Sequence, residues 1–410
     1  MIRTLALLSA ATALSACASL DPYPVDRPVM APQAYAGELP PSGVAENWWQ
    51  GFGDPVLNDL VEQGLAANLD IAIARDRLRA ADALLQAERA DRLPRLDGAA
   101  EAAIGLGTSD SDSASIGLLG TFDPDISGRL SAQIRAAAAD YAQAEYILAD
   151  QRTLVAAAIA AQYIEYRRTG AQLELLAQST ELQERTLRIV TLRFEAGLAA
   201  NLDVRRAAAD LAQTRARRGL IEIARAGAAN RLAILLGQSP GLFTPAPAPG
   251  EHTIPDYAGG PPAGTPADLL RRRADVLAAE AALLRASAIV GVEQADLRPS
   301  LTIPASVMLG DGSIGGILDE FIASIGAALD LPLFDGGRRR AEVDAARAEA
   351  DGLEEALVLW GRGADYGYLL DHELGALAEG LTAGLGGDHR DAEVFDCQQL
   401  HRRAAEVRTE

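Results

Sequence analysis

Cysteine and histidine are scarce in this chain. Its 410 residues contain only Cys17 and Cys397, and four histidines. Two cysteines cannot build a disulfide framework, and if Cys17 is modified then Cys397 has no partner within the chain. His252 is the only histidine before residue 372, so the main body cannot assemble a histidine acid–base pair. The fold must therefore be held together by packing.

Positive charge and long apolar runs are also in short supply. The net charge is -20, and a nucleic-acid partner would call for basic patches. Beyond the first twenty residues, no segment provides the roughly 20 apolar residues that a membrane-spanning helix needs. If the chain crosses a membrane, it must do so in a closed barrel, because lipid leaves no backbone group unpaired.

The N-terminus carries a targeting signal. Arg3 is followed by a short apolar stretch that ends in Leu14-Ser15-Ala16-Cys17. Small residues before a cysteine at this point resemble the bacterial lipobox, which predicts a signal peptide over residues 1–16 and an acylated Cys17. Ala18, rather than aspartate, favours sorting to the outer membrane, with residues 17–53 as an extended anchored segment. The alternative is an ordinary signal peptide with a chance cysteine.

The chain contains an internal repeat. Residues 70–105 and 275–310 align without a gap at an offset of 205, and both run from alanine-rich helix through a proline into an alternating segment. A proline-rich linker over residues 239–265 separates the two halves. We therefore predict a first repeat over residues 54–238 and an incomplete second repeat over residues 266–355.

Each half is expected to begin with a long helix and to continue through two strands into another long helix. Residues 54–92 and 127–196 are helical in composition, and the second of these would reach roughly 100 Å. Within this second helix, apolar residues recur at coiled-coil spacing and form one narrow stripe, which comprises Leu148, Val155, Ile159, Tyr166, Leu173 and Leu176. Such a helix fits a coiled coil or a helical array rather than a compact globule.

The strands are expected over about residues 96–123 and 301–331. Leu96, Ala100, Ala102, Ile104 and Leu106 are predicted to face one way, whereas Asp97, Glu101, Gly105 and Gly107 face the other. Leu301 to Leu309 and Phe321 to Leu329 alternate in the same manner. Strands of this length and pattern suit a transmembrane barrel. Two soluble hairpins on a helical protein are the alternative.

Several spaced motifs resemble TolC-like outer-membrane efflux lipoproteins of the NodT type. They are Trp48-Trp49-x-x-Phe52-x-Asp54, Asn68-x-Asp70, Leu93-Pro94-x-Leu96, Leu235-Leu236-Gly237-x-x-Pro240, Arg298-Pro299 and Pro332-Leu333-Phe334-Asp335-Gly336-Gly337-Arg338. The resemblance implies a mainly α fold with transmembrane β: a long periplasmic α-helical barrel, and four strands per chain completing a trimeric outer-membrane β-barrel. It further implies an efflux or export conduit in outer-membrane lipid that works with a periplasmic adaptor and an inner-membrane pump.

Residues 193–204 resemble the turn of this family's helical hairpin at the periplasmic entrance. Gly197 can end the long helix in the left-handed conformation, and Asn201 or Asp203 can cap the next helix. The resemblance makes Gly197, Leu198, Asp203 and Val204 the candidate adaptor-docking residues. A plain helix–turn–helix without a partner is the alternative.

The motifs that suggest catalysis or metal binding lack the features that these functions require. Gly237-Gln238-Ser239-Pro240-Gly241 matches the serine-hydrolase pattern, but a helix precedes it and Pro240 has no N–H for an oxyanion hole. Cys397 and His401, with the more distant His389, match a zinc site poorly. We predict no catalytic, cofactor-binding or metal-binding residues.

The internal repeat and the helical periodicity both end after Glu355. Residues 356–410 are crowded with glycine, and no heptad stripe survives there. We hypothesise a shift of the coding frame near residue 355, which reading the other two nucleotide frames would test. Two functional alternatives stay open: a lipid-anchored periplasmic coiled-coil protein, and a non-functional remnant of an efflux channel.

Overall fold

The computed structural model describes Pro24 and residues 47–103, 113–241, 243–245, 253–258, 272–309 and 321–363. The predicted signal peptide, Cys17, most of the linker and the tail from residue 364 lie outside the described residues. The chain divides into two units, residues 1–360 and 361–410, and the first contains nearly all of the described residues.

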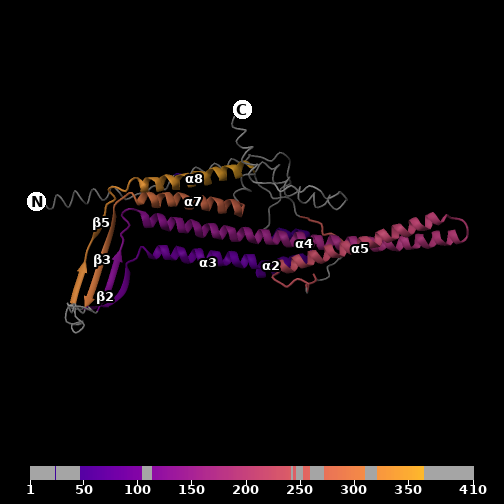
Figure 1. Ribbon diagram of the computed structural model, residues 1–410, viewed down its shortest axis with the longest axis horizontal. Coiled ribbons are helices and arrows are strands. Elements are labelled where there is room, and N and C mark those ends of the chain that lie inside the picture. The colour runs from indigo at the N-terminus through magenta and orange to yellow at the C-terminus, as the bar shows by residue number, and fades with distance from the viewer. Residues whose placement is uncertain are drawn as a thin grey trace, which may run out of the picture. The chain divides into compact units, whose positions relative to one another are not determined.

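Helices make up most of the described chain (Figure 1). They are η1 Trp48–Phe52, α2 Pro55–Ala67, α3 Leu69–Ala90, α4 Arg129–Glu195, α5 Asn201–Leu235, α7 Ala274–Ala295 and α8 Arg338–Gly363. The 67 residues of α4 confirm the long helix expected over 127–196. The single helix expected over 54–92 is wrong, because Asn68 has an extended backbone and its side chain accepts hydrogen bonds from Asp70 N and Ile71 N, which starts α3.

One antiparallel sheet joins the two halves of the chain. Its strands are β1 Arg95–Ala103, β2 Ser113–Phe122, β3 Ser300–Leu309, β4 Phe321–Ile325 and β5 Ala328–Asp330, in the order β1-β2-β3-β4 with β5 also on β3. β2 of the first half pairs with β3 of the second, with Gly120 opposite Ala305. The returning strand of the second half is split between β4 and β5.

The helices lie in the same order as the strands. α4 packs against α3 and α7, and α8 contacts α7 through Ala286, Val290, Ala346 and Ala350. Figure 1 shows α3, α4, α7 and α8 side by side, each leading into or out of the sheet, while α5 doubles back along the far part of α4.

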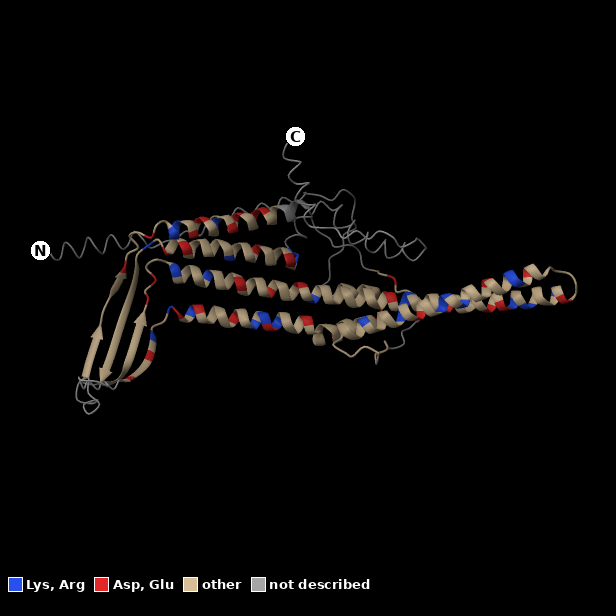
Figure 2. Cartoon of the chain, in the orientation of Figure 1, with Lys and Arg blue, Asp and Glu red and all other residues tan. Residues whose placement is uncertain are grey.

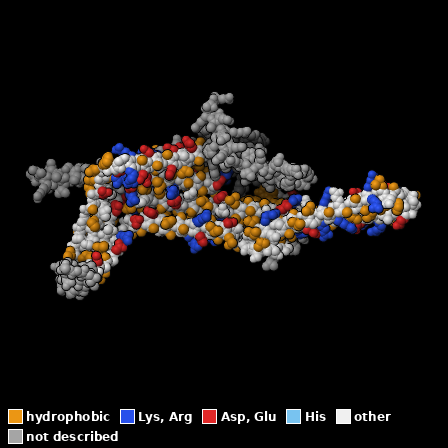
Figure 3. Space-filling view, viewed as in Figure 1, with side chains coloured by type: hydrophobic (Ala, Val, Ile, Leu, Met, Phe, Trp, Pro, Cys, Tyr) orange, Lys and Arg blue, Asp and Glu red, His pale blue; other side chains and the backbone are white. Residues whose placement is uncertain are grey.

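The main hydrophobic core sits where α2 meets α4 and the end of α5. Leu57, Val61, Ile159, Tyr163 and Leu232 are almost fully buried there. Elsewhere the unit is one element thick, so many large apolar side chains stay exposed, as the orange atoms in Figure 3 show on one face. A layer of this kind leaves apolar faces that a single copy cannot cover.

Candidate functional site

The sheet has one apolar face. In an antiparallel pair, residues directly opposite each other point to the same side, so the register assigns every strand residue to a face. On one side lie only apolar residues and glycine: Leu96, Gly98, Ala100, Ala102, Ala114, Ile116, Leu118, Gly120, Phe122, Leu301, Ile303, Ala305, Val307, Leu309, Phe321, Ala323, Ile325 and Leu329. Both repeats contribute to this face, because the β2–β3 pairing brings their apolar sides together.

The opposite face is mixed and mostly polar or small. It carries Asp97, Ala99, Glu101, Ser113, Ser115, Gly117, Leu119, Thr121, Thr302, Pro304, Ser306, Met308, Ile322 and Ser324. The hydroxyl groups of Ser306 and Ser324 form a hydrogen bond of 2.8 Å across β3 and β4. The alternation expected for Leu96 to Glu101 is confirmed, whereas Ile104 to Gly107 lie outside the described residues. This is the pattern of strands that meet lipid on one side and water on the other.

Each half uses an aspartate to start the helix that follows its strands. Asp125, with φ 53°, accepts hydrogen bonds from Leu130 N at 2.8 Å and Ser131 N at 2.9 Å. Asp335 accepts from Gly337 N at 2.9 Å and Arg339 N at 3.2 Å. These N–H groups hold the pKa of the Asp335 carboxyl below its ordinary value. Both repeats thus use an aspartate before the helix to accept main-chain hydrogen bonds from its first turn, although the donors lie at different distances along the chain.

The α4–α5 turn closes as expected at Gly197. Gly197 has φ 73°, its N–H donates to Phe194 O at 2.9 Å, and Leu198 N donates to Arg193 O at 2.8 Å. These two bonds form a Schellman motif, which needs the left-handed conformation that glycine adopts freely.

The expected cap of α5 is wrong. Ala200 is the N-cap residue of α5, and no side chain caps it. Asn201 and Asp203 already lie within the first turn, so they follow the position from which a capping side chain acts. Asp203 instead places a negative charge in that turn, where it interacts favourably with the positive end of the helix dipole.

The hairpin tip exposes apolar side chains. Leu198 is 75% exposed, and Leu202 and Phe194 are exposed beside it. Gly197 and Asp203 are also exposed, while Val204 is half-buried. Leu202 and Phe194 were not among the predicted docking residues, although their position within a few residues of the turn was a usable signal. Apolar groups at the end of a hairpin are typical of a contact surface.

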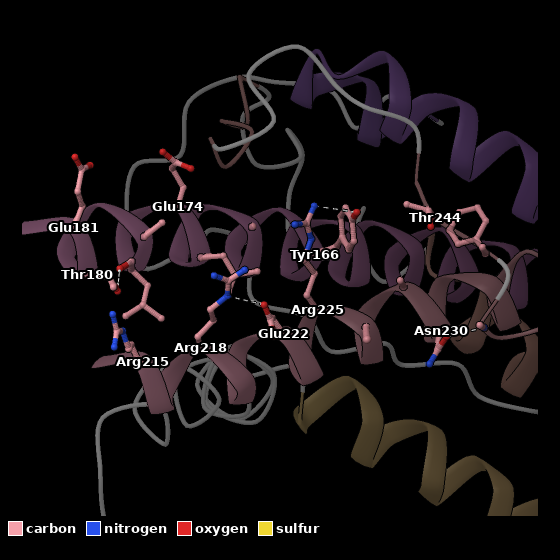
Figure 4. Close-up of a pocket in the computed structure, with 18 of the residues that line it drawn as sticks. Tyr166, Glu174, Thr180, Glu181, Arg215, Arg218, Glu222, Arg225, Asn230 and Thr244 are labelled. Carbon is pink, nitrogen blue, oxygen red and sulfur yellow. Dashed lines mark hydrogen bonds and ion pairs between the residues drawn. The ribbon is translucent and has the colours of Figure 1, made fainter. Parts of the chain in front are cut away.

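Polar pairs hold the two arms of the hairpin around a groove of about 1070 Å³ (Figure 4). The Arg225 guanidinium lies 4.6 Å from the centre of the Tyr166 ring and donates to its hydroxyl oxygen at 3.0 Å. Nearer the tip, Arg215 pairs with Glu184 at 2.6 Å. Within the described part of the chain, no group of histidine, cysteine and carboxylate side chains could hold a metal ion.

A buried polar cluster that sequence reasoning missed lies beside the main core. Tyr163 donates its hydroxyl hydrogen to Asp54 Oδ2 at 2.7 Å, and Arg167 Nη2 donates to Thr253 O at 2.9 Å. Burial, together with the Asp54 carboxylate, raises the pKa of the Tyr163 hydroxyl. The only local indication of this cluster was the spacing of Tyr163 and Arg167, which are four residues apart and therefore share one helix face.

The serine-hydrolase pattern has the wrong context. Gly237 follows helix α5 with φ 67°, and Gln238 N donates to Ala233 O at 2.8 Å, so this segment is a helix end and not a strand–turn–helix elbow. His389, Cys397 and His401 lie outside the described residues. Among the described helices, none has the length and apolar character to cross a membrane.

Comparison with known proteins agrees with this architecture. The sequence model of the outer membrane efflux protein family matches residues 60–238 and 265–358. The pyoverdine export outer membrane protein OpmQ of Pseudomonas aeruginosa is 31% identical over 376 residues, which cover 86% of this chain and 77% of OpmQ. Nodulation protein T of Rhizobium leguminosarum bv. viciae is 30% identical over 319 residues, 74% of this chain and 64% of that protein.

Solved structures share the fold. The outer-membrane channel OprN superposes with a TM-score of 0.69 at 30% identity, covering 95% of this chain and 88% of OprN. CusC, described as forming a transmembrane channel, superposes with a TM-score of 0.74 at 21% identity, covering 94% and 86%.

Proposed function

This chain belongs to the outer membrane efflux protein family, the outer-membrane channel components of efflux systems, and we propose that three copies form one passive conduit for small molecules. The protein is located in the outer membrane. The observation that carries the proposal is the apolar sheet face that runs unbroken across both repeats. Such a face is stable in lipid and costly in water.

Ring closure follows from the open edges of the layer. Within the described residues, β1 and β4 each pair on one side only, and α3 and α8 lie at the corresponding edges of the helix layer. Lipid tolerates no unpaired strand edge, so β4 of one copy pairs with β1 of the next. β1 and β4 run in opposite directions, which keeps the closed sheet antiparallel at about twelve strands.

The helical hairpin is the proposed contact with the rest of an efflux system. Gly197, Leu198, Asp203 and Val204, together with the exposed Phe194, would dock a periplasmic adaptor, which in turn reaches an inner-membrane pump. Exposed apolar groups around a glycine turn support this assignment. Replacing Leu198 with aspartate should abolish export, while the trimer still forms. Loss of the trimer instead would assign Leu198 to assembly.

The remaining parts of the chain have simpler roles in this proposal. Cys17 carries lipid and anchors the chain that precedes η1 to the outer membrane, and residues 239–265 link the repeats. The boundaries predicted at residues 53 and 356 are wrong, because Trp48–Phe52 form η1 and α8 continues to Gly363; the divergent tail follows α8. A coiled-coil protein held entirely in the periplasm is the weaker candidate, because it would leave the apolar sheet face in water.

The decisive experiment is cell fractionation followed by gel electrophoresis without heating. We expect the protein in the outer-membrane fraction as a trimer that heat converts to the monomer. Recovery as a water-soluble monomer would overturn the proposal. Protease treatment of permeabilised cells separates the alternative, since lipid-embedded strands resist cleavage and exposed hairpins do not.

A further inference from the structure

Apart from Arg95, the first residue of β1, the two strand hairpins carry negative charge and no positive charge. All 37 cationic side chains of the chain are arginine, and none lies in residues 96–128 or 299–337, which also lack histidine. The same two segments contain eleven carboxylates: Asp97, Glu101, Asp110, Asp112, Asp123, Asp125, Asp311, Asp319, Glu320, Asp330 and Asp335. Figure 2 shows β2, β3 and β4 without charged residues over most of their length, while charge returns in the helices.

Glu101 is a carboxylate of this sheet that lacks a counter-charge in the described part of the chain. The register places it opposite Ser115 on the polar face, away from the apolar side. Its side chain is exposed. Arg95, the cation at the start of the same strand face, pairs with Asp97 at 2.9 Å. Arg95 lies six residues from Glu101, or roughly 20 Å along an extended strand.

The position of Glu101 along β1 determines where its side chain would lie in the conduit. β1 begins at Arg95, next to the helices, and Glu101 lies near the opposite end of the strand. The polar face on which it stands would line the lumen once the apolar face meets lipid. Three-fold closure then repeats the residue three times at one height.

We propose that Glu101 forms a ring of carboxylates near the outer mouth of the conduit and makes permeation selective for cations over anions. The inference rests on the proposed trimeric conduit. Rings of acidic side chains give cation selectivity in channels because they raise the local cation concentration and repel anions. A barrel of about twelve strands is narrower than the wide porins, so a permeating ion passes within about a Debye length of the wall.

The test is the reversal potential of the full chain reconstituted in a planar bilayer across a potassium chloride gradient. We expect the unmodified protein to prefer potassium over chloride. Glu101→Gln should lower the permeability ratio at least about two-fold, and Glu101→Arg should lower it further towards anion preference. Ser115→Glu, which adds a second carboxylate beside the first, should raise the ratio.

Controls separate this inference from the conduit itself. Glu62→Gln removes an exposed carboxylate on α2, outside the sheet, and should leave the permeability ratio unchanged. The selectivity should also shrink at high salt, because mobile ions screen the ring. If Glu101→Gln forms conducting channels with the same reversal potential as the unmodified protein, the role of Glu101 is overturned and the conduit is unaffected. Absence of conductance from the unmodified protein would overturn the conduit, and this inference with it.

Discussion

Arg167 Nη1 lies 2.8 Å from Asp54 Oδ2, and both side chains are buried although 113 residues separate them. Asp54 is also the N-cap of α2, where it accepts a hydrogen bond from Val56 N at 2.9 Å. With Thr253 O as a further acceptor, Arg167 joins the start of the first repeat, the middle of α4 and the segment between the repeats.

Removing one member of this pair should be costly. Arg167→Met leaves the Asp54 carboxylate buried without its cation, so we expect the free energy of unfolding to fall by about 3–5 kcal/mol. Arg168→Met is the matched control. It breaks the more exposed pair with Glu165 and should cost at most about 1 kcal/mol. Thermal unfolding followed by circular dichroism compares the two, and equal losses would contradict the interpretation.

The hairpin tip depends on glycine at one position. Gly197→Ala forces a side chain into the left-handed conformation, which should lower stability by about 1 kcal/mol and shift the tip geometry. Gly219→Ala, an exposed position within α5 with open space around it, should instead stabilise the helix by up to about 1 kcal/mol. The measurement is denaturant unfolding of both variants. A stabilising effect of Gly197→Ala would show that the turn does not need its backbone conformation.

Two neighbouring leucines test the two-faced sheet. Leu118 lies on the apolar face opposite Val307, and Leu119 on the other face opposite Ser306, with similar exposure. Leu118→Arg should block trimer assembly in the outer membrane, because each arginine that faces lipid near the bilayer midplane costs about 2–4 kcal/mol. Leu119→Arg should assemble, since its side chain would reach the aqueous lumen. Electrophoresis of unheated membrane fractions shows whether each variant forms a trimer. Assembly of Leu118→Arg together with failure of Leu119→Arg would contradict the assignment of the apolar face to lipid.

The anchor has its own test. Cys17→Ser should abolish incorporation of labelled palmitate into the protein, because the acylated thiol is gone. Cys397→Ser should leave labelling unchanged. Labelling that persists in Cys17→Ser would mean that the cysteine at this position is an ordinary residue of a signal peptide.

The local part of this architecture follows from the sequence itself. Helix periodicity predicts α4 almost to its ends, and strand alternation places Leu96 and Asp97 on opposite faces, because both patterns repeat within a few residues. Gly197 is equally local, since only its own backbone must turn. The break at Asn68 also carried a local signal, a capping residue before aspartate, which the alanine-rich surroundings obscured.

Only the tertiary structure decided how these pieces combine. No local pattern states that Gly120 lies opposite Ala305, yet this register brings the apolar sides of both repeats onto one face. The pairing of Arg167 with Asp54 is equally hidden, because charged residues on helices are usually solvated. Such contacts depend on where distant segments meet once the chain has closed its long loops, and that placement is a property of the whole fold.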